Sequence, residues 1–219
     1  MKSQNSISSN LPTSFSDVVK DYAELGIDSV LDAGVLRDIP ILKTLLSVRD
    51  IGVKMRHFLY ERKVHAFLEG LREGLNNDEM AIEGFMKGEK ERDRFAETAF
   101  VLIERYDDIH KPEVMGLLWA ACAKGSVSYD QVARLCHLID RVYWEDLLVL
   151  LNFKDGVHAS GELAVESLCS VGLVQRGGID SGTYGSTEEG NMSGGYHFAK
   201  TDLGSALVSY GLQKLTQVD

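Results

Sequence analysis

The sequence is poor in the residues that signal disulfide frameworks, metal clusters and membrane spans. It has three prolines and three cysteines in 219 residues. Cys122, Cys136 and Cys169 are odd in number and widely spaced, which fits neither a disulfide framework nor Cys-x-x-Cys metal ligation. No stretch approaches eighteen uninterrupted apolar residues, so no spanning helix is predicted. The polar residues 1–15 lack the apolar core of a secretory signal and are predicted to form a flexible tail. These absences favour a reducing, cytoplasmic location.

Positive charge is also scarce. The chain has 23 Lys and Arg against 33 Asp and Glu, a net charge of −10. Residues 151–219 hold four cationic and eight anionic side chains, a balance of −4, which leaves −6 for residues 1–150. Neither part has the cationic excess typical of nucleic-acid-binding domains. The segment from Arg37 to Arg72 differs, because it contains eight Lys and Arg residues but only four Asp and Glu residues. Its cations define a predicted basic surface, which consists of Arg37, Lys43, Arg49, Lys54, Arg56, Arg62, Lys63 and Arg72.

Apolar residues recur at helical spacing through the first 150 residues, and this pattern predicts a helical bundle over residues 16–153. Pro112 suits the first turn of one helix, and Gly125 is a natural residue to end it. A further helical stripe is predicted to break near Trp144. The run from Ile39 to Leu75 is either one helix or two helices joined near Gly52 or Tyr60.

Residues 154–219, the C-terminal segment, have a different pattern. Gly156 and Gly161 predict a turn, and a short helix is predicted to end at Gly172. The stretches "GLVQRG" and "GYHFAKT" predict two strands, followed by a closing helix. Seven glycines between Gly177 and Gly195 separate the strands and predict a hairpin loop. A phosphate-binding loop is disfavoured, because the G-x-x-x-x-G-K-[ST] motif is absent.

The stretch "LCSVGLVQRG…GYHFAKTDLGSALV" resembles the second half of winged-helix domains. The matching residues are Leu168, Gly172, Leu173, Val174, Tyr196, Thr201, Gly204 and Leu207. The resemblance implies a mainly α protein, in which a helical bundle is followed by a small α+β winged-helix-like domain over residues 154–219 with a glycine-rich β-hairpin wing. DNA-binding members carry basic residues on the recognition helix and the wing. Here "ASGELAVESLCS" contains no Lys or Arg, so the resemblance favours protein contact through Arg176, Tyr184 and Tyr196.

The residue types that carry chemistry are present without the spacing that chemistry needs. Cys136 and His137 are neighbours in a predicted helix, so their side chains do not meet as a nucleophile and base must. The acidic run "ERYDD" is typical of a solvated helix end as well as of a divalent-cation site. We therefore expect no catalytic, cofactor-binding or metal site.

The stretches "LDAGVLRDIPILKTLLSVRDIG" and "GSVSYDQVARLCHLIDRVYWEDLLVLL" are similar to uncharacterised bacterial helical proteins, a resemblance that covers most of residues 17–150. Some of those proteins are associated with mobile elements or phage defence. The leading hypothesis is a non-enzymatic, cytoplasmic interaction or regulatory protein of bacterial or phage origin that acts through protein contacts. One alternative is a nucleic-acid-binding winged-helix regulator. Another is a peripheral effector in phage defence, whose basic surface lies on an anionic membrane. A homo-oligomer is compatible with each hypothesis.

Overall fold

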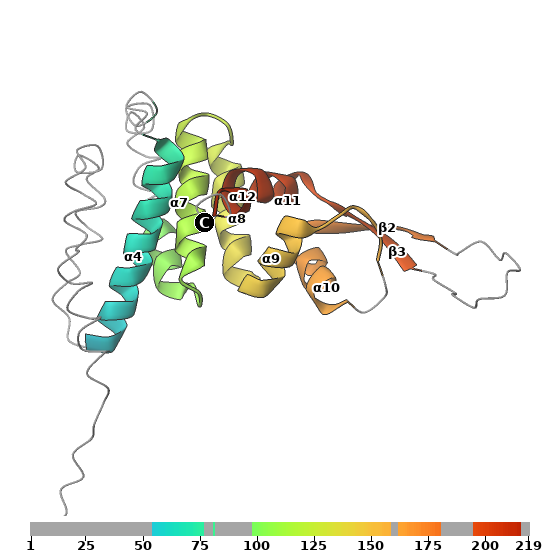
Figure 1. The fold of residues 1–219 in the computed structure, drawn as a ribbon, viewed down its shortest axis with the longest axis horizontal. Coiled ribbons are helices and arrows are strands. Elements are labelled where there is room, and N and C mark those ends of the chain that lie inside the picture. Colours follow the sequence, from blue (N-terminus) through green and yellow to red (C-terminus); the bar gives the residue numbers. More distant parts are fainter. Residues whose placement is uncertain (1–53, 77–80, 82–97, 159–161, 181–194, 216–219) are drawn as a thin grey trace, which may run out of the picture.

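The computed structural model describes residues 54–76, 81, 98–158, 162–180 and 195–215. Within these residues the protein is mainly helical with a small antiparallel sheet, as the sequence predicts (Figure 1). Residues 98–105 are helical. The other elements, in chain order, are α4 (Lys54–Leu75), α7 (His110–Ala123), α8 (Tyr129–Arg141), α9 (Trp144–Asn152), β1 (Gly156–His158), α10 (Leu163–Ser170), β2 (Val174–Asp180), β3 (Gly195–Lys200), α11 (Asp202–Leu207), the π-helix η2 (Val208–Leu212) and α12 (Gln213–Leu215).

Several predictions fall outside the described residues. These are the flexible tail over residues 1–15, part of the basic surface and one wing residue, namely Arg37, Lys43, Arg49 and Tyr184. No helix within the described ranges is both long enough and apolar enough to cross a bilayer.

The described helix boundaries confirm one predicted break and correct another. Helix α4 continues through Tyr60, because no proline or glycine interrupts its first four turns, so the predicted joint there is wrong. The alternative joint at Gly52 lies outside the described residues. The break near Trp144 is confirmed: Val142 takes an extended conformation between α8 and α9.

The two ends of α7 follow the usual rules of helix termination. Pro112 is the third residue of α7 rather than its first, and it is tolerated there because the N–H groups of a first turn have no intrahelical partner. Gly125 follows the helix with a φ of 74°. Its N–H donates to the carbonyl of Cys122 at 2.9 Å, so its predicted role in ending this helix is confirmed.

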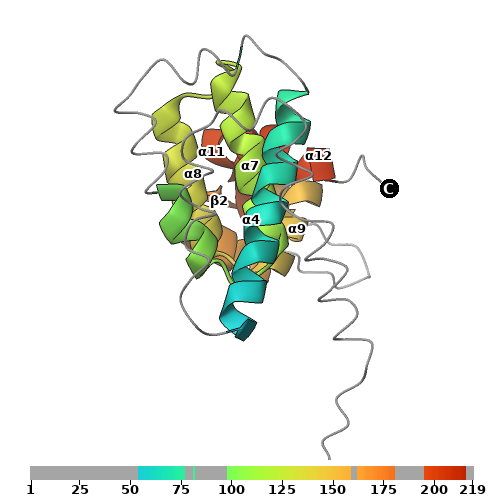
Figure 2. The same ribbon diagram turned by 90° about the vertical axis from the view of Figure 1, so that its left-hand side faces the viewer.

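Helices α4 and α7 lie side by side, and glycines bring their backbones together (Figure 2). A Cβ atom on Gly70 would lie 2.1 Å from the carbonyl oxygen of Glu113, and one on Gly116 would lie 2.2 Å from that of Phe67. Any larger side chain would push the two helices apart. The residues of α7 from Lys111 to Ala121 are buried at nearly every position, which makes α7 the central helix.

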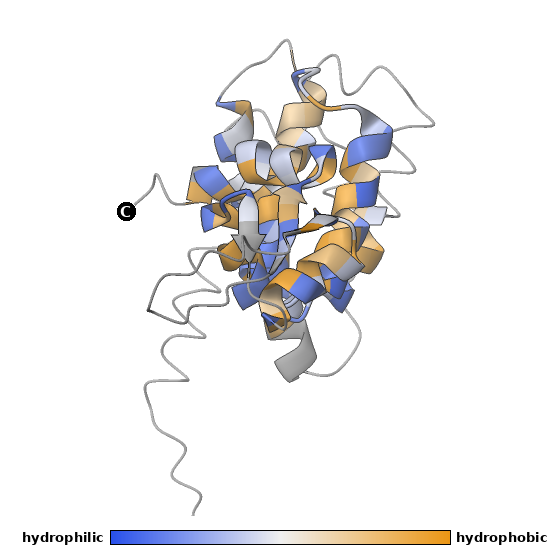
Figure 3. Cartoon of the chain, turned by 90° about the vertical axis from the view of Figure 1, so that its right-hand side faces the viewer, coloured by the Kyte–Doolittle hydropathy of each residue, from blue (hydrophilic) through white to orange (hydrophobic). Residues whose placement is uncertain are grey.

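The hydrophobic core is one continuous cluster that extends from α4 to η2. Seen from the hairpin end, the helices show hydrophobic residues interleaved with hydrophilic ones, as amphipathic helices do (Figure 3). The run formed by α11, η2 and α12 returns to α7, where a Cβ atom on Gly211 would lie 2.9 Å from Cγ1 of Val114. The core therefore crosses residue 153, and the division into residues 16–153 and 154–219 stays a prediction.

The sheet has three antiparallel strands in the order β1-β3-β2. Strand β1 corrects the predicted turn, because Val157 pairs with His197 and Gly156 pairs with Phe198. Strands β2 and β3 confirm the two predicted strands, and they project from the helices as a hairpin (Figure 1). Side chains alternate between the faces of a sheet. Phe198 is accordingly buried against the helices, while His197 is exposed.

Candidate protein-interaction surface

The end of α10 is fixed by a turn that only glycine adopts easily. Gly172 has a φ of 80°, its N–H donates to the carbonyl of Cys169 at 3.0 Å, and the N–H of Leu173 donates to that of Leu168 at 3.0 Å. This pair of hydrogen bonds is the Schellman motif. It confirms the predicted helix end at Gly172 and directs the chain from α10 into β2.

Thr201 and Gly204 join the end of β3 to the same turn. The hydroxyl of Thr201 donates to the carbonyl of Gly172 at 2.8 Å and accepts from the N–H of Gly204 at 3.1 Å. A Cβ atom on Gly204 would lie 2.0 Å from the carbonyl oxygen of Leu173. Three residues that match the winged-helix pattern therefore have structural roles at one junction of α10, β2, β3 and α11.

Arg176 connects the hairpin to α10. Its guanidinium group contacts both carboxylate oxygens of Glu166 and lies 4.6 Å from the centre of the Tyr196 ring. The side chains of Arg176 and Glu166 are 40% and 36% exposed, so water screens the pair. The structure thus brings the predicted wing residues Arg176 and Tyr196 together. It also places the only cation of β2 against a carboxylate of this chain.

A second polar junction closes the base of the sheet. The ammonium group of Lys200 donates to the carbonyl of Phe153 at 2.6 Å and lies 3.4 Å from Oδ1 of Asp155. The backbone N–H of Lys200 donates to the same oxygen at 2.9 Å. This backbone hydrogen bond is the main reason that the pKa of Asp155 lies below its usual value. Asp155 is therefore ionised at neutral pH, and its side chain is 55% exposed.

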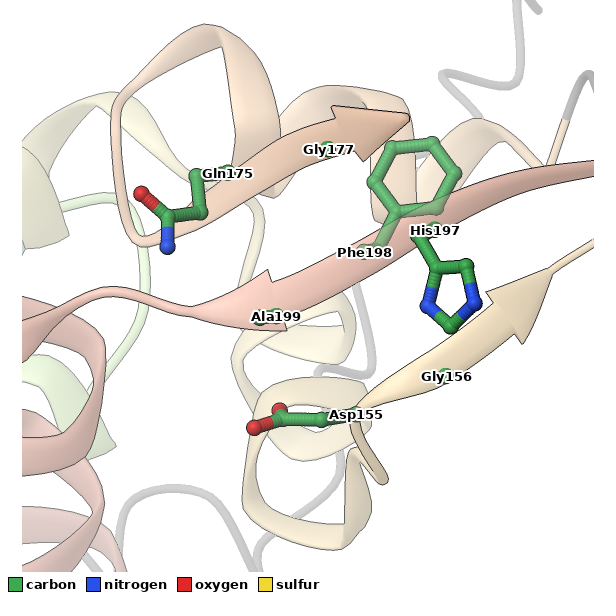
Figure 4. Close-up of a pocket in the computed structure, with 7 residues that line it drawn as sticks. All are labelled: Asp155, Gly156, Gln175, Gly177, His197, Phe198 and Ala199. Atoms are coloured by element: carbon green, nitrogen blue, oxygen red, sulfur yellow. The ribbon is translucent and has the colours of Figure 1, made fainter. Parts of the chain in front are cut away.

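The outer face of the sheet is hollowed where its side chains are small. The hollow has a volume of about 260 Å³ and is lined mostly by apolar atoms. In Figure 4, Gln175 on β2 and Asp155 before β1 stand on either side of Ala199, and His197 projects from β3 at the other end. The lining residues are Asp155, Gly156, Gln175, Gly177, His197, Phe198 and Ala199. We refer to this feature as the sheet hollow.

A bulge in β2 widens the sheet hollow. Arg176 pairs with Phe198 and Ile179 pairs with Tyr196, so Gly177 and the residue after it oppose His197 alone. Two residues against one on the partner strand form a β-bulge. A Cβ atom on Gly177 would lie 3.5 Å from Cβ of His197, and its absence leaves the space open.

The described part of the basic surface consists of cations that contact the protein itself. The ammonium group of Lys63 donates to the carbonyl of Glu104 at 3.1 Å. Burial, opposed by nearby carboxylates, lowers its pKa. Arg72 pairs with Glu69 at 2.5 Å, and Arg62 also interacts within the chain. Lys54 and Arg56 lie within α4, but their side chains are not among those described. These cations therefore do not define one free patch.

The candidate chemical residues are held apart or buried. Cys136 is fully buried, and burial raises the pKa of its thiol to about 12, so it is inert as a nucleophile at neutral pH. In the described ranges no three His, Cys, Asp or Glu side chains are grouped closely enough to hold a metal ion. In "ERYDD", Asp107 binds the buried Lys111. Burial raises the pKa of Asp107, but the hydrogen bond and charge of Lys111 outweigh it and lower that pKa.

The sequence did not predict the sheet hollow. Its residues come from three strands, and the pairing of Gln175 with Ala199 is visible only in the folded sheet. The sequence contains a partial signal: in "GYHFAKT", His197 and Ala199 alternate with the aromatic residues Tyr196 and Phe198, which places them together on one face of the strand.

No protein-family model matches the chain, and no curated protein or solved structure matches it either. Function is therefore inferred from the geometry of the chain itself.

Proposed function

We propose that residues 154–219 form a winged-helix-like module that binds another protein, and that the chain is a non-enzymatic, cytoplasmic regulator of bacterial or phage origin. The order α10, β2, β3 and α11 supports the winged-helix assignment. So do the roles of Gly172, Thr201 and Gly204 at their junction. In this module α10 occupies the place of the recognition helix and the β2–β3 hairpin is the wing.

The internal pairing of Arg176 and Lys200, two of the four cations in residues 154–219, is the observation that carries this proposal. Binding to duplex DNA depends on Lys and Arg side chains that neutralise phosphates. Helix α10 has neither residue type. Arg176 is paired with Glu166, and Lys200 contacts Phe153 and Asp155. A phosphate would have to displace a carboxylate from each of these two cations, so the module is suited to a partner other than nucleic acid.

Exposed apolar side chains supply the alternative kind of contact. Leu163 at the start of α10 is 85% exposed, and Ile179 near the tip of β2 is 71% exposed. Covering such apolar side chains by a partner removes them from water, which favours association. We assign both residues to the contact surface, together with Arg176 and Tyr196.

The proposal is tested by affinity capture from a bacterial host lysate at low and high salt, with and without nuclease. The wild-type chain is expected to retain a defined protein under all four conditions. The double variant Leu163→Gln and Ile179→Gln is expected to lose it. The matched control is the double variant Leu59→Gln and Val101→Gln, which changes two exposed apolar residues elsewhere (48% and 47% exposed) and is expected to retain the partner.

Two outcomes would contradict the proposal. Recovery of nucleic acid that is released at high salt would indicate a DNA- or RNA-binding regulator, whose affinity must fall steeply with salt concentration. Binding to anionic vesicles that is lost in Lys63→Gln with Arg72→Gln would indicate the membrane-surface effector. In the second case the partner would be held by the basic surface rather than by the module.

A further inference from the structure

The sheet hollow is a concave site whose lining includes a carboxylate, whereas the contact surface was assigned from the exposed apolar side chains of Leu163 and Ile179. Its floor consists of residues with little or no side chain, Gly156, Gly177 and Ala199. At about 260 Å³ it is smaller than the roughly 300–1,000 Å³ of pockets that enclose small-molecule ligands. A single inserted side chain of a partner suits this size better than a whole ligand does.

One end of the sheet hollow holds a carboxylate, that of Asp155, which shares its charge with the ammonium group of Lys200. Asp155 stands there, more than half exposed, and the hydrogen bond from the backbone of Lys200 keeps its pKa low and the carboxylate ionised. Gln175 stands across Ala199 from it (Figure 4), and rotation of its terminal amide group turns the amide oxygen toward the hollow. An occupant therefore needs an apolar stem for the floor and a cationic, hydrogen-bonding head for this end.

We propose that the sheet hollow receives an arginine side chain from a basic segment of the protein partner, an inference that rests on the proposed function. The methylene stem covers the floor, and the guanidinium group donates to the carboxylate of Asp155 and to the amide oxygen of Gln175. The flat imidazole ring of His197 borders the same space and offers a face for the planar guanidinium. The chain's net charge of −10 favours approach of a basic partner.

The contacts that Asp155 already makes leave it the capacity to bind this group. They converge on Oδ1, which accepts from the backbone N–H of Lys200 at 2.9 Å and lies 3.4 Å from its ammonium group. That ammonium group is closer to the carbonyl of Phe153, at 2.6 Å. A carboxylate has about four acceptor sites, and the backbone hydrogen bond from Lys200 occupies one of those on Oδ1. Nucleic acid is the less suitable occupant, since this carboxylate repels phosphate.

The test is an NMR titration of the full chain, labelled with ¹⁵N, at low salt. The probe is N-acetylarginine methylamide, and the comparison probe is the uncharged isostere N-acetylcitrulline methylamide. The arginine probe is expected to shift the amide signals of Gly156, Gln175, Gly177 and Ala199 to saturation. The citrulline probe is expected to bind roughly tenfold more weakly, because it lacks the charge-assisted hydrogen bonds.

Three variants show whether the binding belongs to the sheet hollow. Asp155→Asn keeps an acceptor for the backbone of Lys200 and is expected to weaken arginine binding roughly tenfold. Ala199→Leu leaves the charge unchanged, fills the floor and is expected to abolish binding. Asp202→Asn removes the same charge from an exposed position in the first turn of α11, outside the hollow, and is expected to bind as the wild type does. Each variant is compared at equal folded fraction, measured by circular dichroism.

The outcomes separate this inference from the proposed function. Equal binding of the two probes, or binding that Asp155→Asn leaves unchanged, overturns the arginine site. If affinity capture still yields a protein partner with Asp155→Asn at wild-type strength, the proposed function stands and the arginine site is not part of that interface. Localised arginine binding, with capture that Asp155→Asn weakens and Asp202→Asn does not, supports both.

Discussion

The α4–α7 pair and the β2–β3 hairpin use glycine in opposite ways. Gly70 and Gly116 are required because there is no space between two packed backbones. Gly178, in the bulge of β2, has nothing within 4 Å of the position that a Cβ atom would take. The first region is held by apolar contact and close approach, and the second by polar groups that remain half exposed. Stability is thus concentrated in the helices, while the sheet keeps an open face.

The comparison is tested most directly by making the same substitution, glycine to alanine, in both regions. We expect Gly70→Ala to lower the free energy of unfolding by about 1–3 kcal/mol, because its Cβ atom would overlap the carbonyl of Glu113. In a helix without that contact, Gly→Ala would stabilise by about 1 kcal/mol. Gly178→Ala is expected to change stability by less than about 0.5 kcal/mol. Urea unfolding measures both values, and a stabilised Gly70→Ala would show that the two helices do not touch there.

A smaller effect is expected from two tyrosines of the helical region whose hydroxyl groups are buried. The hydroxyl of Tyr106 donates to the carbonyl of Cys136 at 3.0 Å. No described residue lies at hydrogen-bond distance from the buried hydroxyl of Tyr60. We therefore expect Tyr106→Phe to cost about 1–2 kcal/mol and Tyr60→Phe to be neutral or stabilising. Equal losses in thermal or urea unfolding would mean that Tyr60 has a partner in the folded protein.

The same two variants can be followed at alkaline pH. Burial, followed by the charge of Glu104, raises the pKa of Tyr60 to about 12, above the usual value of about 10. Because the folded state disfavours the tyrosinate, Tyr60 leaves stability independent of pH below about pH 10, and stability falls as the pH rises from there through 12. Absorbance of tyrosinate should show one late-titrating group fewer in Tyr60→Phe.

The smallest effect is expected at the junction between the hairpin and α10. Glu166→Gln is predicted to cost less than about 1 kcal/mol, because both side chains of the pair are partly exposed. The cost should shrink further as salt rises from 0.05 to about 0.5 M. Glu145→Gln removes an exposed charge from the first turn of α9 and serves as the control. A loss of more than about 2 kcal/mol in the free energy of unfolding that persists in high salt would show that this ion pair is a major source of stability. The contrast between the stable helices and the weakly held hairpin would then be wrong.

Local signals in the sequence were sufficient for the helix ends and for the order of the C-terminal elements. Gly125 and Gly172 could be predicted as helix ends because a Schellman turn needs only a few consecutive residues. Strand β1 was missed, since its three residues become a strand only by pairing with β3, far along the chain. The approach of Gly70 to Glu113 depends in the same way on two helices that are distant in sequence.

The basic surface shows why a charge count cannot identify a binding site. The sequence places Lys63 and Arg72 in a stretch with excess positive charge, but Arg72 pairs with Glu69 in the same helix, and the fold supplies a partner for Lys63. One partner of Lys63, the carbonyl of Glu104, is 41 residues away. The sheet hollow was hidden for a related reason: the contact of Asp155 with Lys200 joins residues 45 positions apart. The winged-helix assignment stays a prediction, with the junction at Gly172 as its strongest support.

The return of η2 to α7 has a consequence for biosynthesis. Val114 and Leu118 on α7 face Gly211, which the ribosome adds long after α7 has been made. Until then the nascent chain carries an uncovered apolar stripe on its central helix, and such surfaces attract chaperones or other nascent chains. The last helical run therefore acts as a late closure. The protein completes its core only when that run has emerged from the exit tunnel.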